Sequence, residues 1–112
     1  PEVLAASDIL KIEGISAAVW NCASVKPLDI AALSGLPEGP IFTAEEHSVL
    51  GGFGSAVAEH ICSTRSPRQV IRFGIPDEFL HDCGEQHEAR IHCRLDAAGL
   101  ADQVKACRAS WE

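Results

Sequence analysis

The sequence predicts a mixed α/β domain whose strands form a largely parallel sheet. Three short apolar segments, at 16–23, 40–44 and 69–74, have the length and composition of strands. Segments with helical spacing of apolar residues follow each of them. This alternation of strand and helix is the order produced by right-handed crossovers in a parallel sheet.

Size and charge narrow the class of protein. A chain of 112 residues is enough for one domain. Nine basic and sixteen acidic side chains give a net charge of −7, which a nucleic-acid backbone would repel. No apolar run approaches the ~18 residues of a membrane span. The five cysteines are odd in number and widely spaced, so we expect free thiols in a cytoplasmic protein rather than a disulfide framework.

The first element is predicted to be a helix over residues 2–13. Val3, Ala6 and Leu10 recur at helical spacing, and Gly14 then provides a typical helix end. A helix that precedes every visible strand is unusual in such a fold. We therefore expect that the first strand or strands of the sheet are missing from this chain.

The next segment, 16–23, is apolar almost throughout and includes Val19 and Trp20. Such a run predicts a strand buried on both faces of a helix-covered parallel sheet. Residues 26–29 break this strand, and a short helix through Ala32 and Leu33 is predicted to follow.

The central part of the chain predicts a strand, a helix and a strand. Two prolines and two glycines make residues 35–40 a loop, and the strand at 40–44 follows it. A glycine-rich turn then opens a helix whose buried face carries Phe53, Val57 and Ile61. The strand at 69–74 comes next.

Two helices are predicted in the last third of the chain. Residues 85–95 form a polar stretch of helical character, and Asp96 is a plausible N-cap for a final helix. That helix has a single apolar stripe, which consists of Leu100, Val104, Cys107 and Trp111.

The glycine-rich turn is the most distinctive local feature. It follows the carboxyl end of a predicted strand and precedes a helix, which is where open α/β sheets bind ligands. It is not a dinucleotide fingerprint, because Val57 stands where the third glycine should be, and it lacks the lysine of a P-loop. From the pattern alone we favour tight packing of the helix against the sheet or a partner.

Three other groups of residues could carry chemistry. Glu46 and His47 could act as a carboxylate and a general base, but neighbours on an extended segment point to opposite faces. We therefore favour a solvated or interface pair.

The arginines at 65, 68 and 72 could hold a phosphorylated ligand, although pairing with acidic side chains or solvation is the favoured role.

A cluster of cysteine and histidine residues lies between positions 83 and 93. Cys83 and His87 are four residues apart and would share a helix face, whereas the adjacent His92 and Cys93 would diverge. Four converging ligands are needed for structural zinc, so we predict no metal site there. The roles of these four residues stay open.

Five segments in order resemble the C-terminal domain of transketolases, especially the C-terminal subunit of split-chain transketolases. The longest is the run TAEEHSVLGGFGSAVAE at 43–59. The others are EGI at 13–15, VKPLD at 25–29, FGIPDEF at 73–79 and LDAAGL at 95–100. The resemblance covers residues 2–106. It departs from the family pattern at Cys93 and Arg94, where the family usually has an aromatic residue and a glycine.

The resemblance implies a three-layer αβα fold for residues 1–112, taken as one N-terminally truncated transketolase C-terminal domain. It implies a parent enzyme that uses thiamine diphosphate and magnesium to move a two-carbon ketol unit between sugar phosphates. In the family the cofactor lies between the other two domains, across a dimer interface. No catalytic, cofactor-binding or metal-binding residue is therefore carried over to this chain, and the chain alone is predicted to be inactive.

The predicted role is assembly with, and support of, pyrimidine-binding and diphosphate-binding domains on the same or a separate chain, in a homodimeric enzyme of carbohydrate metabolism. The candidate interface comprises Glu46, His47, Gly51, Gly52 and Gly54. The alternative parents are deoxyxylulose-phosphate synthase and the beta subunit of a 2-oxo-acid dehydrogenase, in which the domain would dock a partner. The Glu-Glu-His form of the motif favours a sugar transketolase. A third hypothesis is an independent metal-binding domain that uses Cys83 and His87.

Overall fold

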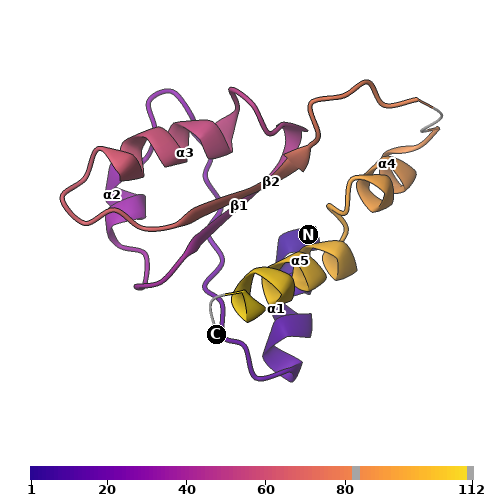
Figure 1. Cartoon of the computed structure of the whole chain (residues 1–112), viewed down its shortest axis with the longest axis horizontal. Coiled ribbons are helices and arrows are strands. Elements are labelled where there is room, and N and C mark those ends of the chain that lie inside the picture. The colour runs from indigo at the N-terminus through magenta and orange to yellow at the C-terminus, as the bar shows by residue number, and fades with distance from the viewer. Residues whose placement is uncertain (82–83, 111–112) are drawn as a thin grey trace. The chain divides into compact units, whose positions relative to one another are not determined.

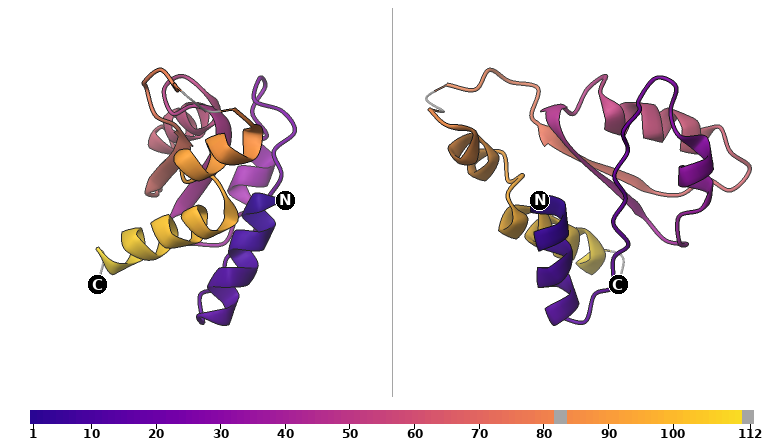
Figure 2. Two further views of the ribbon diagram at one scale, coloured as in Figure 1. Left: turned by 90° about the vertical axis from the view of Figure 1, so that its right-hand side faces the viewer. Right: turned by 180° about the vertical axis from the view of Figure 1, so that it is seen from behind.

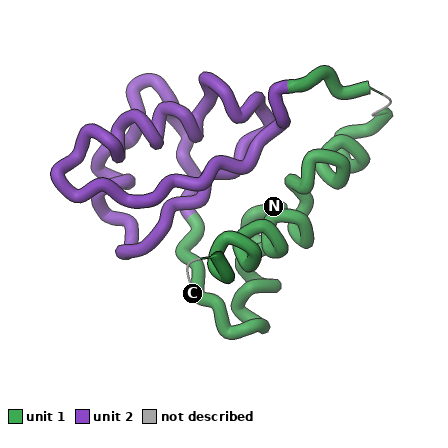
Figure 3. The backbone as a smooth tube through the Cα atoms, in the orientation of Figure 1, with its two compact units in different colours: residues 1–19, 78–112 green, residues 20–77 purple. Residues whose placement is uncertain are grey.

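The computed structural model describes residues 1–81 and 84–110, which divide into two compact units (Figure 3). Unit 1 contains residues 1–19 and 78–112, and unit 2 contains residues 20–77. The elements, labelled in Figure 1, are α1 (Glu2–Ile12), α2 (Ile30–Ser34), β1 (Ile41–Ser48), α3 (Phe53–Cys62), β2 (Val70–Ile75), α4 (Gln86–His92) and α5 (Ala97–Ala109). Cys83 and Trp111, which the sequence analysis singled out, lie outside the described residues.

Unit 2 is built on a parallel pair of strands. β1 pairs with β2 from Ile41 opposite Val70 to Ala44 opposite Phe73, and α3 connects the two strands and packs against them (Figure 2). The predicted mixed α/β fold with parallel strands is confirmed. The pairing becomes irregular after Ala44, because β1 continues to Ser48 opposite Ile75 through a bulge. The strand is therefore longer than predicted, and it includes both glutamates and the histidine of the motif.

The core of unit 2 lies between the sheet and α3. Ile41, Val57 and Ile61 are buried together, with Phe53 and Val70 partly buried against them. The predicted apolar face of the helix is thus confirmed, because its residues at i, i+4 and i+8 meet the strand side chains. Asp29 caps α2 by accepting a hydrogen bond from the N–H of Ala32 at 3.0 Å, and this confirms the predicted short helix.

The predicted strand at 16–23 is wrong for the structure described. Residues 15–24 form neither helix nor strand, and Val19 and Trp20 are 36% and 55% exposed. An extended apolar segment becomes a strand only when its backbone N–H and C=O groups pair with those of a neighbouring strand. Within the described residues, no backbone hydrogen bond joins 16–23 to another segment.

Unit 1 consists of helices. α1 packs on α5 through Ala6 and Leu10 on one helix and Leu100 and Ala101 on the other, and all four side chains are buried. Val3 belongs to the same predicted stripe, but it is 41% exposed.

Polar contacts join the same two helices at their ends. The Glu2 carboxylate accepts a hydrogen bond from the N–H of Ala97 at 2.9 Å, at the start of α5. Lys105 donates to Glu13 at 3.0 Å and lies 3.0 Å from a carboxylate oxygen of Asp102. The hydrogen bond to Asp102, followed by that to Glu13, raises the pKa of Lys105 above its ordinary value of 10.5.

The end of α4 contains a residue in an unfavourable backbone conformation. Arg94 has φ = 58°, in the left-handed region that favours glycine. Its N–H bonds to the carbonyl of Ile91 at 3.0 Å, and the N–H of Leu95 bonds to that of Arg90 at 2.7 Å. These two bonds form a Schellman motif with arginine at the position that glycine usually occupies. Arg94 is the same residue at which the sequence departs from the family's glycine.

We predict that Arg94→Gly stabilises the protein by about 0.5–1 kcal/mol, because glycine adopts this conformation without a steric cost. Urea-induced unfolding followed by circular dichroism measures the difference. The matched control is Arg108→Gly in the last turn of α5, which should lower the stability by roughly 1 kcal/mol, the cost of glycine within a helix. A loss of stability in both variants would contradict the left-handed conformation of Arg94.

Candidate functional site

The turn between β1 and α3, whose two elements are labelled in Figure 1, is organised by the carboxylate of Glu45. Its Oε2 accepts a hydrogen bond from the N–H of Phe53 at 2.7 Å, and its Oε1 accepts one from the N–H of Gly54 at 2.8 Å. These N–H groups belong to the first turn of α3, where intrahelical acceptors are absent and negative charge is favourable. The carboxylate therefore ties the second half of β1 to the beginning of the helix.

A second set of contacts holds the middle of the turn. The Oγ of Ser55 donates to the carbonyl of Val49 at 3.2 Å and accepts from the N–H of Gly51 at 3.1 Å. From β2, the guanidinium of Arg72 donates to the same carbonyl at 2.6 Å and to the Ser55 Oγ at 3.0 Å. The backbone N–H of Val49 bonds to the carbonyl of Ile75 at 3.0 Å. The turn is thus fastened to both strands and to α3.

The glycines of the turn have reasons within unit 2 itself. Gly51 has φ = +74°, a conformation that other residues rarely adopt. A Cβ at Gly52 would collide with the Glu45 carboxylate and lie 2.7 Å from Nδ1 of His47. A Cβ at Gly54 would lie 2.5 Å from Oγ1 of Thr43. The packing interpretation of these glycines therefore has a physical basis, while their part in an interface stays a prediction.

Glu46 and His47 are both exposed on the last part of β1. Nδ1 of His47 lies 2.9 Å from the carbonyl oxygen of Ser48, within hydrogen-bond distance. The structure therefore gives His47 a local backbone contact and an exposed position, while the role of Glu46 and His47 in an interface stays a prediction.

The turn is not an open anion site. The Glu45 carboxylate already occupies the N–H groups at the beginning of α3, and a phosphate there would meet its negative charge. The arginines do not form a cradle either. Arg72 holds the turn, and Arg68 donates to the carbonyls of Gly39, at 2.7 Å, and Pro37. Two of the three arginines thus bind backbone carbonyls.

The cysteine and histidine cluster is described only in part. His87 and His92 are exposed on α4, Cys93 is half-buried, and Cys83 lies outside the described residues. Among residues 1–81 and 84–110, no group of three or more His, Cys, Asp or Glu side chains has an arrangement that could hold a metal. Cys22, Cys62, Cys93 and Cys107 are free thiols.

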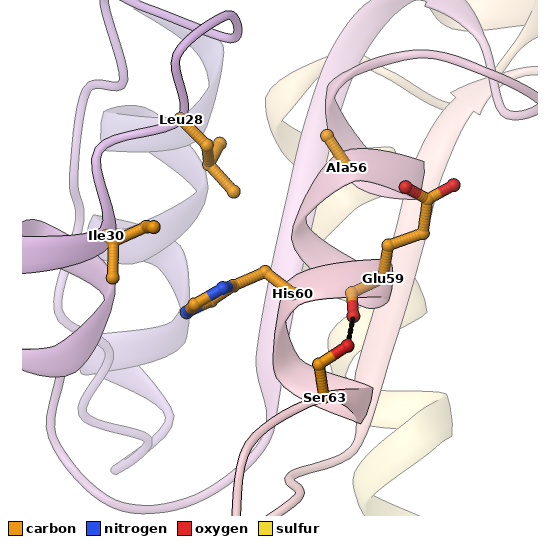
Figure 4. A pocket seen from close by; sticks show the side chains of 6 residues that line it. All are labelled: Leu28, Ile30, Ala56, Glu59, His60 and Ser63. Carbon is orange, nitrogen blue, oxygen red and sulfur yellow. Dashed lines mark hydrogen bonds between the residues drawn. The ribbon is translucent and has the colours of Figure 1, made fainter.

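A shallow groove of about 330 Å³ lies between the beginning of α2 and the outer face of α3 (Figure 4). Its lining consists of Leu28, Ile30, Ala56, Glu59, His60 and Ser63. The His60 ring points towards Ile30, whereas the Glu59 carboxylate extends beside Ala56, so the two do not converge (Figure 4). The groove includes none of the predicted interface residues.

In the part of the chain that is described, no helix has the length and apolarity to cross a membrane.

Comparisons with known proteins identify the family of the chain. Residues 1–98 match the family described as "Transketolase, C-terminal domain". The chain belongs to this family. Its relatives include 1-deoxy-D-xylulose-5-phosphate synthases from Chlorobium luteolum, 37% identical, and from Syntrophotalea carbinolica, 41% identical. The matches cover 89% and 93% of this chain but 16% and 17% of the relatives.

A split-gene transketolase, solved as an inactive β4 tetramer, has a similar structure, with a TM-score of 0.80 and 36% sequence identity. The similarity covers 94% of this chain and 33% of the other. The predicted family and fold are thus confirmed for this transketolase C-terminal domain. Because relatives of both enzyme types match, the preference for a sugar transketolase over a deoxyxylulose-phosphate synthase stays a prediction.

Glu45 is the residue whose role the sequence analysis missed. Ile41 and Thr43 are buried, and Glu45 follows them at the same spacing of two along β1. This alternation, together with the helix start eight residues later, was the signal that could have identified a carboxylate aimed at α3. The neighbouring exposed pair, Glu46 and His47, drew attention instead.

We predict that Gly54→Ala lowers the free energy of unfolding by about 1–3 kcal/mol, because the new Cβ would overpack against the Thr43 hydroxyl. Thr43→Ala in the same chain removes that hydroxyl and should recover part of the loss. The control is Gly35→Ala, where the nearest atoms to the new Cβ are 3.6 Å away and φ is −86°. Urea-induced unfolding measures the free energy of unfolding of the three variants. If Gly54→Ala and Gly35→Ala are equally stable, the close packing at Gly54 is wrong.

Proposed function

We propose that this chain is the non-catalytic C-terminal domain of a thiamine-diphosphate-dependent transferase and that it supports the assembly of the catalytic domains. The observation that carries the proposal is the turn after β1. Its polar groups are used to fasten the turn to unit 2, whereas its tip is presented to solvent, with Leu50 53% exposed. This arrangement suits a surface that contacts a neighbouring domain better than a site that performs chemistry.

The chain matches only a small part of each longer relative, and this supports its assignment as one domain of a larger enzyme. The chain spans 16% of the Chlorobium luteolum relative and 33% of the split-gene transketolase chain. We propose that the pyrimidine-binding and diphosphate-binding domains of the parent enzyme, on the same or a separate chain, are its partners and that the parent is a homodimer. The chain would then act in the cytoplasm, where its free thiols persist.

Thiamine diphosphate and magnesium do not fit the residues described here. A diphosphate would meet the Glu45 carboxylate at the beginning of α3. Within residues 1–81 and 84–110, no acidic or histidine cluster is arranged to hold a cation. We therefore assign the binding of both groups to the other domains of the parent enzyme and derive no step through them.

The leading proposal for the parent is a sugar transketolase, because of the Glu-Glu-His form of the motif and the split-gene structural relative. The 1-deoxy-D-xylulose-5-phosphate synthases among the relatives favour a second candidate, a synthase of that product. A partner-docking domain of a 2-oxo-acid dehydrogenase beta subunit is the remaining alternative.

Reconstitution tests the proposal. The chain and the catalytic domains of its parent enzyme are expressed separately, and each is assayed alone and mixed, with thiamine diphosphate and magnesium. We expect the chain alone to be inactive and the mixture to be more active than the catalytic domains alone. Ketol transfer between sugar phosphates and formation of 1-deoxy-D-xylulose 5-phosphate distinguish the two candidate parents. Activity of the isolated chain, or no gain on mixing, would contradict the proposal.

The interface itself is tested by Leu50→Asp at the tip of the turn. A buried aspartate without a partner is costly, so association with the catalytic domains should weaken about tenfold or more. Leu4→Asp on α1 is the control, because the same side chain is similarly exposed there, at 60% against 53% for Leu50. Equal association of Leu50→Asp and the unchanged chain, measured by analytical ultracentrifugation, would show that the turn is not the interface.

A further inference from the structure

One side chain, that of Glu45, joins the two sides of the turn that carries the proposed interface. The Glu45 carboxylate bonds to the N–H groups of Phe53 and Gly54, so these contacts enclose residues 46–52, the last three residues of β1 and the connection to α3, which we call the loop. We propose that Glu45 is the positioning residue of this interface: its carboxylate determines how the loop is presented to the catalytic domains. This inference rests on the proposed function.

The geometry restrains the carboxylate itself. Each oxygen has its own donor, at 2.7 and 2.8 Å, and both contacts are partly buried. Hydrogen bonds to a charged acceptor are stronger than those between neutral groups, and here the charge also faces the positive end of α3. The two bonds therefore restrict rotation of the side chain and define the distance between Glu45 in β1 and the beginning of α3.

The second anchor lies on the other side of the loop tip. Val49 is held by Ser55 and Arg72, and the N–H of Leu50 bonds to Oγ of Ser48 at 3.2 Å. Leu50 and Gly51 are exposed between these anchors and the Glu45 contacts. The N–H of Gly51 also bonds to Oγ of Ser55 at 3.1 Å. Release of the Glu45 contacts would therefore loosen the base of the turn and let the tip shift, while the Ser48, Ser55 and Arg72 contacts stay in place.

A neutral side chain of nearly equal volume distinguishes the charge and hydrogen bonding of Glu45 from the space that its side chain fills. In Glu45→Gln one carboxylate oxygen becomes an NH₂ group, which can only donate and would face one of the two backbone N–H donors. The volume of the side chain is nearly unchanged. One of the two hydrogen bonds to the beginning of α3 would then be lost, and two N–H donors, one from the side chain and one from the backbone, would face each other without an acceptor.

The experiment compares three variants of the chain in association with the catalytic domains. Glu59→Gln makes the same chemical change at an exposed position of α3. Val57→Ala removes two methyl groups from the buried face of that helix, away from the loop. We expect Glu45→Gln to weaken association about tenfold, equivalent to about 1.4 kcal/mol. We expect Glu59→Gln and Val57→Ala to change association by less than about twofold at a temperature where all the variants are folded.

Hydrogen exchange of the Leu50 and Gly51 amides supplies a second readout. Exchange should be faster in Glu45→Gln and unchanged in Val57→Ala. If both variants weaken association equally, the effect is general destabilisation and the positioning role is wrong. If Leu50→Asp weakens association while Glu45→Gln does not, the positioning role is wrong and the interface stands. If neither variant weakens association, the proposed interface itself is wrong.

Discussion

The structure of unit 2 depends on the contact between the Glu45 carboxylate and the first N–H groups of α3. A sheet of two strands with one helix buries little apolar area, and the described core is correspondingly small, with Ile41, Val57 and Ile61 at its centre. The carboxylate supplies a directed interaction at the junction where strand, turn and helix meet. Without it, two backbone donors at the helix end would lack this partner, and the strand end would lose its link to the helix.

The same contact explains the composition of the turn. Gly52 and Gly54 leave room for Glu45, His47 and Thr43, and Gly51 adopts a left-handed conformation that other residues rarely take. A glycine-rich segment before a helix resembles an anion-binding loop, but here the anion is a side chain of the protein. The residues by which this segment resembles the family therefore have a role in the packing of β1 against α3, in addition to any role on an exposed surface.

Regular elements were predictable where local pattern and tertiary contact agree. The stripe of Phe53, Val57 and Ile61 and the alternating apolar strands required only periodicity. The strand at 16–23 was not predictable in this way, because strand formation requires a hydrogen-bonding neighbour that composition does not supply. Glu45 could have been found from its spacing after Ile41 and Thr43. By contrast, the Ser55 and Arg72 contacts depend on how β2 is placed beside β1.

Amide hydrogen exchange tests the central contact most directly. In a ¹⁵N-labelled chain, the amides of Phe53 and Gly54 should exchange slowly, because both donate to the Glu45 carboxylate and have no acceptor within α3. In Glu45→Gln at least one of these two amides should exchange about tenfold faster or more, while Glu59→Gln should leave both unchanged. If both amides exchange as fast as in an unfolded chain, or if Glu45→Gln leaves them protected, the carboxylate does not hold the beginning of α3 and the account is wrong.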